Sequence, residues 1–225
     1  MNISSIRDGL VSLIFFQRCY NCRTPLKAGE YFVCARCGRI DYFQDHNPLF
    51  VPECTYLDAL HVIGRYQSAM EHAITEFKYH YNMSAYAFLK RILISRIALY
   101  DFTWVETVIP VPLFPAKQRQ RGFNQSEMLA ASVARSIARP MRRNLLGRTV
   151  NTQSQAGLNG HQRRINLTGA FQIVSPMSPN LRSILLIDDV VTTGSTANEC
   201  AFTLKMQGVE RVELLALATR LSTEP

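Results

Sequence analysis

The sequence predicts an α/β fold in which a parallel sheet is flanked by helices and carries a small N-terminal zinc-knuckle module. Two strand–turn–helix patterns predict the sheet: the apolar run Ile184–Ile187 leads through a polar turn into a helical pattern, and Val105–Val111 does the same earlier in the chain. Two Cys-x-x-Cys pairs near the N-terminus predict the module. We therefore expect two parts: residues 1–54, with an N-terminal helix and the cysteines, and residues 55–225, with the sheet.

The composition is that of a globular protein with one strongly basic segment. The 225 residues are 47% hydrophobic, which suits one domain of ordinary size with a small appendage. The formal net charge is +8, and residues 117–164 hold ten basic side chains against a single acid, Glu127. Such a block usually forms a solvated surface. Between the strands of a sheet it favours the binding of a polyanion or a pyrophosphate.

No segment predicts a membrane span, because the longest apolar runs are much shorter than the roughly 18 residues that a span requires. The apolar stretch Met1–Phe16 carries Asp8 and lacks a small-residue cleavage site. We interpret it as a short amphipathic helix and not as a signal peptide. These observations predict a cytoplasmic protein.

The cysteines divide into four that are spaced as metal ligands and two that are not. The four are Cys19, Cys22, Cys34 and Cys37, in two Cys-x-x-Cys pairs separated by eleven residues. This spacing predicts a structural Zn2+ site with four thiolate ligands, which a segment this short needs because it has little core of its own. A redox pair is the alternative, and disulfides are disfavoured in a reducing compartment. Cys54 and Cys200 are expected as buried apolar side chains, and the loop residue His46 is a spare candidate ligand.

The middle of the chain predicts strands and then two helical stretches. A polar, proline-containing linker covers Asp41–Pro52, strands interrupted at Gly64 follow in Tyr56–Tyr66, and Ala69–Tyr100 is helical with a break near Asn82. The apolar stripes of the helical stretches consist of Ile74, Phe77, Tyr81 and Ala85, and of Phe88, Ile92 and Leu99. We interpret the aromatic residues as packing, with a stacking platform for bases as the alternative. Lys78 is placed where it could reach a ligand.

A basic loop follows the strand Val105–Val111, whose prolines prevent it from continuing as a central strand. The loop, residues 114–126, leads into a helix that ends near Ala138. The buried face of this helix is predicted to consist of Leu129, Ala130, Val133 and Ile137. Arg119, Arg121 and the permissive Gly122 precede the helix N-terminus, an arrangement suited to a pyrophosphate. The alternative is a solubilising loop.

Residues 144–171 show little periodicity and predict a long loop with short structured pieces. Long loops in small domains often close over ligands. This one carries basic and amide side chains suited to a lid over a diphosphate. The lid candidates are Arg148, Gln153, Arg163 and Arg164.

The most informative stretch is Asp188-Asp-Val-Val-Thr-Thr-Gly-Ser-Thr196, which directly follows the apolar run. The helix after it has Ala197, Cys200, Ala201 and Leu204 on its buried face. A capping-box spacing joins Thr196 and Glu199, and Gly208 is placed to end the helix. A last strand follows at Arg211–Ala218.

This stretch predicts a site with two chemically different halves. The amides of a helix N-terminus, the hydroxyls of the turn and the flexible Gly194 suit a phosphate. Asp188 and Asp189 would repel a phosphate, but they suit vicinal sugar hydroxyls or a divalent cation beside it. A ribose 5-phosphate satisfies both halves. The alternative is an ordinary turn that carries polar residues.

The stretch resembles the phosphoribosyl pyrophosphate (PRPP) signature of the type I phosphoribosyltransferases. With the thiolate knuckles, Ile109-Pro-Val-Pro112 and Arg121-Gly-Phe-Asn-Gln125 in the same order, nearly the whole chain resembles the ComF family, phosphoribosyltransferase-like proteins associated with natural competence. The resemblance implies a type I phosphoribosyltransferase-like sheet, with Asp188 and Asp189 on the ribose hydroxyls and Mg2+. It puts the 5-phosphate among Thr192, Thr193, Gly194, Ser195 and Thr196. It also implies a role in processing transforming DNA in the cytoplasm.

Two classes of function remain. A phosphoribosyltransferase would bind PRPP with Mg2+ and displace pyrophosphate, with Arg119 and Arg121 stabilising the leaving diphosphate. The sequence identifies no general base, so catalytic residues stay unassigned. A non-catalytic protein would use the basic segment and the zinc module on single-stranded DNA or on a competence or recombination protein. The Asp188–Asp189 pair favours a phosphoribosyl ligand, because a protein that binds only DNA has little use for two acids in a phosphate cleft.

Overall fold

The computed structural model describes residues 17–39, 48–49, 51, 54–149 and 169–220. Its main feature is a sheet of four parallel strands in the order β1-β6-β5-β2. The strands are β1 (Ala59–Arg65), β2 (Thr107–Pro110), β5 (Ser183–Val191) and β6 (Arg211–Thr219). The predicted α/β class with a parallel sheet is confirmed.

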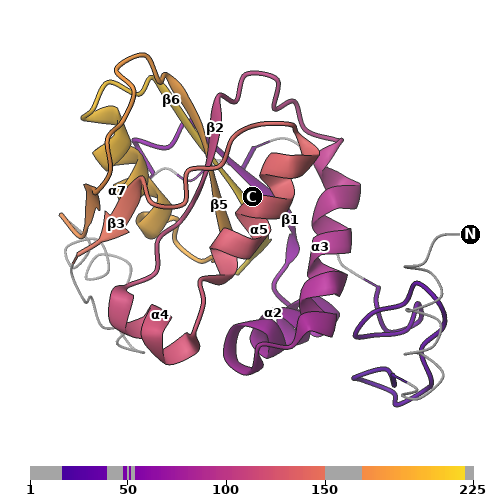
Figure 1. Ribbon diagram of the computed structural model, residues 1–225. Coiled ribbons are helices and arrows are strands. Elements are labelled where there is room, and N and C mark those ends of the chain that lie inside the picture. Colours follow the sequence, from indigo (N-terminus) through magenta and orange to yellow (C-terminus); the bar gives the residue numbers. More distant parts are fainter. Residues whose placement is uncertain (1–16, 40–47, 50, 52–53, 150–168, 221–225) are drawn as a thin grey trace, which may run out of the picture.

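Helices cover both faces of the sheet (Figure 1). On one face lie α2 (Ser68–His80), α3 (Met83–Ile97) and α5 (Gln125–Ser136). On the other lie α7 (Ser195–Lys205) and an antiparallel ribbon of β3 (Leu146–Arg148) and β4 (Phe171–Ile173). The short helix α4 (Pro115–Arg121) buries no side chain and lies beyond the carboxyl end of β2.

The central strands are continuous apolar runs because both of their faces are covered. In β5, residues 184–187 are at most 1% exposed, and so are residues 214–218 of β6. Alternate residues enter the two cores: Leu185 and Ile187 pack with the α2–α3–α5 layer, and Ile184 and Leu186 pack with the α7 layer. β2, which contains a proline, lies at the end of the strand order, as predicted.

β5 continues past the predicted end at Ile187 as far as Val191. Its pairing with β6 is the reason, since Asp188 still pairs with Ala216 and Val191 with Thr219. The two aspartates therefore lie on the last part of a strand, where the sheet holds their backbone, and not in the turn that follows.

The helical stretch is broken at Asn82, as predicted. The Asn82 side chain is the N-cap of α3 and accepts hydrogen bonds from the amides of Ser84 and Ala85, at 3.0 and 3.2 Å. Two expected stripe residues are exposed instead, Tyr81 by 54% and Leu99 by 46%. Each lies just beyond the end of its helix, where helical periodicity no longer decides which way a side chain points.

Two other local expectations are corrected, and a third is made more specific. Tyr56–Tyr66 holds one strand, β1, because Gly64 pairs with Ala218 inside the ladder and does not interrupt it. The loop 114–126 contains α4, which begins at a proline and ends at Gly122 in the left-handed conformation. The short structured pieces expected in 144–171 include β3, which pairs with β4 at the end of this stretch.

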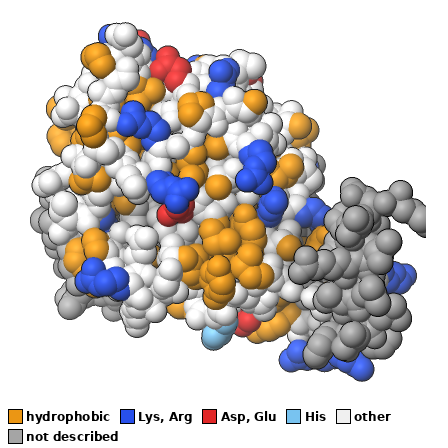
Figure 2. Space-filling model, viewed as in Figure 1, with side chains coloured by type: hydrophobic (Ala, Val, Ile, Leu, Met, Phe, Trp, Pro, Cys, Tyr) orange, Lys and Arg blue, Asp and Glu red, His pale blue; other side chains and the backbone are white. Residues whose placement is uncertain are grey.

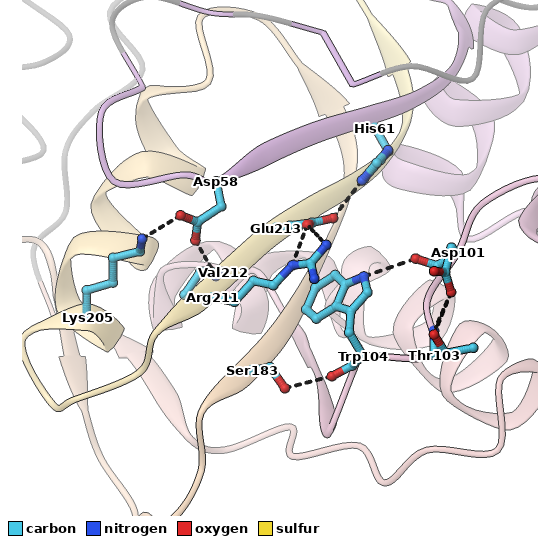
Figure 3. A network of polar contacts seen from close by, with 10 residues as sticks. All are labelled: Asp58, His61, Asp101, Thr103, Trp104, Ser183, Lys205, Arg211, Val212 and Glu213. Carbon is cyan, nitrogen blue, oxygen red and sulfur yellow. Dashed lines mark hydrogen bonds and ion pairs between the residues drawn. The ribbon is translucent and has the colours of Figure 1, made fainter.

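The amino ends of the strands are joined by a polar network in which every charge has a partner (Figure 3). Buried Glu213 lies 2.7 Å from both His61 Nε2 and Arg211 Nη2, and the Arg211 guanidinium lies over the Trp104 ring. Burial by itself raises the pKa of Glu213, but the hydrogen bonds from His61 and Arg211 outweigh it and lower that pKa. Both carboxylate oxygens of Glu213 are thus paired, as expected of a carboxylate that stabilises the fold.

The N-terminal cysteine segment packs on α2 and α3. The Phe32 ring is stacked on Tyr20 at a centroid distance of 4.8 Å, and it lies 6.2 Å from Phe88 of α3. The predicted helix at Met1–Phe16 and most of the predicted linker Asp41–Pro52 lie outside the described residues. Among the helices that the structure describes, none combines the length and the hydropathy needed to cross a bilayer.

Candidate functional site

The polar turn after β5 forms a hollow at the N-terminus of α7, lined by Asp188 and residues 190–197. Gly194, the N-cap residue, has a φ of 71°. A Cβ at this position would lie 2.4 Å from Cys54 Sγ, so glycine is required for conformation and for space. As a glycine, the N-cap has no side chain to accept from the helix amides, and the hydroxyls of Thr193 and Ser195 lie 2.8 Å apart in the turn. Such a helix end offers amide and hydroxyl donors to an anion.

The predicted capping box between Thr196 and Glu199 is wrong. Gly194 is the N-cap, and the Glu199 carboxylate accepts a hydrogen bond of 2.7 Å from the Gly169 amide, just before β4. The predicted buried face of this helix is confirmed. Cys200 is fully buried as expected, whereas Cys54 is only half-buried and its Sγ lies 3.6 Å from the Thr193 carbonyl oxygen.

The acid pair is held by groups from three elements. Asp188 Oδ1 accepts hydrogen bonds from Ser126 Oγ, on α5, at 2.8 Å and from the Asp189 amide at 2.9 Å. Asp189, which is 3% exposed, forms an ion pair of 3.0 Å with Lys78 Nζ, on α2. Both carboxylates therefore lie in one polar cluster at the carboxyl end of the sheet.

The charges of this cluster are not fully balanced. Burial raises the pKa of Asp188 to about 7, and the neighbouring charge of Asp189 adds to this effect. Burial by itself lowers the pKa of Lys78, but the charges of Asp189 and Asp188 outweigh it and raise that pKa. Lys78 is therefore held as a cation, while Asp188 forms no ion pair with any residue that the structure describes.

Further cations lie close enough to this cluster for their charges to act on it. Half-buried Lys117, on α4, has its pKa lowered by burial and then by the charges of Arg148, Arg121 and Lys78, so Lys117 lies near each of these three cations. Arg121 contacts the Gln125 side-chain oxygen and lies over the Tyr79 ring. Burial also lowers the pKa of Arg148. Like charges gathered in this way predict an anionic ligand.

Only some of the residues predicted to bind the diphosphate or to form the lid lie in the cation cluster. Arg121 and Arg148 belong to the cation cluster, whereas Arg119 is exposed on α4 and Gly122 is the C-cap of that helix. The lid candidates Gln153, Arg163 and Arg164 lie outside the described residues.

The sequence did not identify Ser126 and Lys117 as site residues. It indicated that Lys78 could reach a ligand, but did not assign Lys78 to the site. No local motif marks them, because each reaches the acid pair or the cation cluster only through the packing of α2, α4 and α5 against the end of the sheet. A signal for Lys78 does exist: it is a charged side chain next to the fully buried Phe77, close to the predicted helix break.

The four N-terminal cysteines form a second cluster. The sulfur atoms of Cys19, Cys22, Cys34 and Cys37 all lie within 4.8 Å of one another. Cys22 Sγ and Cys34 Sγ are 3.7 Å apart. Four sulfurs placed tetrahedrally about 2.3 Å from one Zn2+ ion would be separated by about 3.8 Å, so the cluster has the dimensions of a four-thiolate metal site.

The thiols of this cluster differ in pKa. Hydrogen bonds from the Thr24 hydroxyl and amide lower the pKa of Cys22 to about 6. The hydrogen bond with Cys22, together with burial, raises the pKa of Cys37 to about 12. A divalent cation favours the thiolate form of all four ligands, which fits this donor set.

The raised pKa of Asp188 generates a prediction about stability. The pKa is about 7 in the folded protein and 3.8 in the reference state, so this carboxyl group stabilises the fold at low pH, and its contribution is lost as the pH rises through 7. Without divalent cations, Asp188→Asn should therefore increase the free energy of unfolding by on the order of 2 kcal/mol more at pH 8 than at pH 5, because ionising Asp188 in the folded protein costs free energy that asparagine avoids. Urea denaturation at both pH values measures this difference. Equal effects at the two pH values would contradict it.

Comparison with known proteins identifies related sequences. No protein-family model matches the chain. The chain is similar to competence protein F of Haemophilus influenzae, with 32% identity over 206 residues that cover 89% of each chain. It is 27% identical to the DNA utilization protein YhgH of Escherichia coli O157:H7, over 90% of this chain and 97% of the relative. It is 24% identical to competence protein ComFC of Bacillus subtilis, over 84% and 78%.

Among solved structures, the chain is similar to an orotate phosphoribosyltransferase from Aeropyrum pernix, with 17% identity, 63% of each chain covered and a TM-score of 0.37. It is also similar to a hypoxanthine phosphoribosyltransferase from Staphylococcus aureus, with 16% identity over 60% of this chain and 68% of that chain and a TM-score of 0.40. The sequence identity with competence protein F extends over most of both chains. This chain belongs to the competence protein F (ComF) family.

Proposed function

We propose that this protein binds PRPP, or a related ribose 5-phosphate ligand, together with Mg2+ at the carboxyl end of β5. The observation that carries the proposal is one hollow that is lined both by Asp188 and by the turn at the N-terminus of α7. A phosphate beside a carboxylate is repelled unless the ligand places an uncharged group or a cation between them. A ribose 5-phosphate with a bound metal ion supplies both.

Each part of PRPP has chemically matched side chains in the site. Residues 192–196 offer hydroxyls and amides to the 5-phosphate, and Asp188 and Asp189 offer oxygen acceptors to the ribose hydroxyls and to Mg2+. Arg121 and Lys117 are half-buried cations suited to the diphosphate, with Arg119 at the outer rim. As lid residues we retain Arg148, Gln153, Arg163 and Arg164.

We further propose that this ligand site serves the handling of transforming DNA in the cytoplasm. The names of the relatives, competence protein F and DNA utilization protein, support a DNA-related role. The proposal assigns residues 55–225 to ligand binding and residues 1–54 to a zinc-binding module.

We propose Zn2+ as the metal of the four-cysteine cluster. Four sulfurs at this mutual separation match Zn2+, which takes four thiolates tetrahedrally in structural sites and leaves no position open for chemistry. Among the described residues 17–39, few apolar side chains are buried, so the metal would replace much of the core that this segment lacks.

Single-stranded DNA is a second candidate ligand, favoured by an aromatic surface beside the cation cluster. Tyr79 and Tyr81 are 67% and 54% exposed, and the Tyr81 ring meets Phe123 edge-on at 4.8 Å. Arg121 lies over Tyr79. Figure 2 shows hydrophobic side chains gathered between α4 and α2 on this face of the molecule. Exposed rings next to cations suit bases stacked along a phosphate backbone.

Replacing both aspartates tests the primary proposal. Asp188→Asn with Asp189→Asn should weaken Mg2+-dependent binding of PRPP by about 100-fold or more, because two charge-assisted contacts are lost. Isothermal titration with PRPP, with and without Mg2+, measures the affinity. Glu210→Gln is the matched control, since it removes one negative charge at a site that is 72% exposed. An unchanged affinity in the double variant would refute the proposed site.

The second candidate is tested with oligonucleotides that differ only in their bases. Fluorescence anisotropy should show that oligothymidylate of about 15 nucleotides binds more tightly than an abasic oligomer of the same length. Tyr79→Ala with Tyr81→Ala should weaken oligothymidylate binding about 10-fold and leave the abasic oligomer unaffected. Tyr56→Ala, which changes a tyrosine that is 38% exposed, is the control. Equal binding of both oligomers would exclude base stacking.

The metal assignment predicts one zinc ion per chain by elemental analysis of the purified protein. Cys22→Ser should remove the zinc and lower the melting temperature by about 5 °C or more, because the module loses its internal support. Cys54→Ser should retain the full zinc content, since Cys54 is not a member of the cluster. Protein without zinc, or with zinc retained in Cys22→Ser, would contradict the assignment.

A further inference from the structure

The cysteine module and the acid pair are joined by a short chain of contacts through α2. Tyr20 lies between the clustered Cys19 and Cys22, and its hydroxyl donates a hydrogen bond of 3.3 Å to Glu76 Oε1 on α2. Lys78 follows two residues later and forms the ion pair with Asp189. Two side-chain contacts thus separate the cysteine cluster from the candidate ligand site.

The module holds Tyr20 from several sides. Its amide donates a hydrogen bond of 2.8 Å to the Phe32 carbonyl, and its ring stacks on the Phe32 ring. The same ring faces His72 of α2 at a centroid distance of 5.7 Å. Since Tyr20 lies inside the first cysteine pair and Phe32 lies two residues before the second, closure of the cluster fixes the position from which the Tyr20 hydroxyl reaches Glu76.

Glu76 in turn fixes the last turn of α2. Its carbonyl oxygen accepts hydrogen bonds from the amides of Tyr81 and Asn82, and its carboxylate contacts His80 Nδ1 at 3.1 Å and Asn82 Nδ2 at 3.4 Å. The helix ends in an unfavourable conformation, because the C-cap Tyr81 has a φ of 51°. A non-glycine residue in this region persists only where its surroundings hold it.

We propose that the four-cysteine module positions Lys78 for the ligand site, acting through Tyr20 and Glu76 on the last turn of α2. Tyr20 and Glu76 are positioning residues, and Lys78 is the group that meets the acid pair. The inference rests on the proposed function for its effect on ligand affinity. Its effect on the last turn of α2 can be measured without any ligand.

The first arm of the test is therefore hydrogen exchange in the ligand-free, metal-loaded protein. Tyr20→Phe keeps the ring packing and removes only the hydroxyl that reaches Glu76. It should speed exchange of the amides of residues 81 and 82 by about 3- to 10-fold and leave the strands of the sheet unchanged. Arg91→Gln is the matched control, since it breaks the contact between α3 and the module's Gly29 carbonyl without touching α2. Unchanged exchange in Tyr20→Phe would overturn the proposal.

The second arm is a double-mutant cycle on PRPP affinity with Mg2+. Tyr20→Phe should weaken binding about 3- to 10-fold in the normal chain and have almost no effect in a Lys78→Gln background, because Lys78 carries the coupling. Independent, additive effects would overturn the proposal, since a merely structural role of Tyr20 would act in both backgrounds. If the normal chain binds no PRPP, the proposed function fails, while the exchange arm still decides whether the module positions α2.

Discussion

Two adjacent carboxylates at the end of β5, Asp189 buried and Asp188 half-buried, constrain the rest of this structure. Moving a charge out of water costs several kcal/mol unless partners compensate for it, and two like charges side by side also repel each other. The compensation comes from outside the strand: Lys78 reaches Asp189 at 3.0 Å, and the Ser126 hydroxyl reaches Asp188 at 2.8 Å. Helices α2 and α5 must therefore both meet the sheet where β5 ends.

The carboxylates at the two ends of the sheet have pKa shifts in opposite directions. At the amino end, Glu213 receives both Arg211 and His61, and its pKa is lowered (Figure 3). At the carboxyl end, Asp188 has a hydroxyl and an amide as partners, and its pKa is raised to about 7. A carboxylate that serves only the fold gains from complete pairing. A carboxylate that has fewer partners than it could accept lowers the stability of the fold. Such a loss of stability is typical of groups that bind a ligand.

The features that could be predicted from the sequence are those whose residues lie close together along the chain. The cysteine cluster and the unit of β5, turn and α7 were predicted because their residues are neighbours along the chain and their spacing sets the geometry. Lys78, Lys117 and Ser126 come from three separate helices, so only tertiary packing brings them to the site. The capping box failed for the same reason: Glu199 is used by Gly169, from another part of the chain.

The arrangement of charges also limits what the site can hold. The acid pair lies among the ends of β5, α2 and α5, while Lys117, Arg121 and Arg148 gather close by, near enough for their charges to repel one another. A simple phosphate would relieve the repulsion among the cations but would meet the carboxylates unfavourably. A metal ion alone would suit the carboxylates and would add to the repulsion among the cations. Both sets are satisfied together by a polyanion that carries a divalent cation or hydroxyl groups on one side, and this is the chemical class to which a sugar diphosphate with Mg2+ belongs.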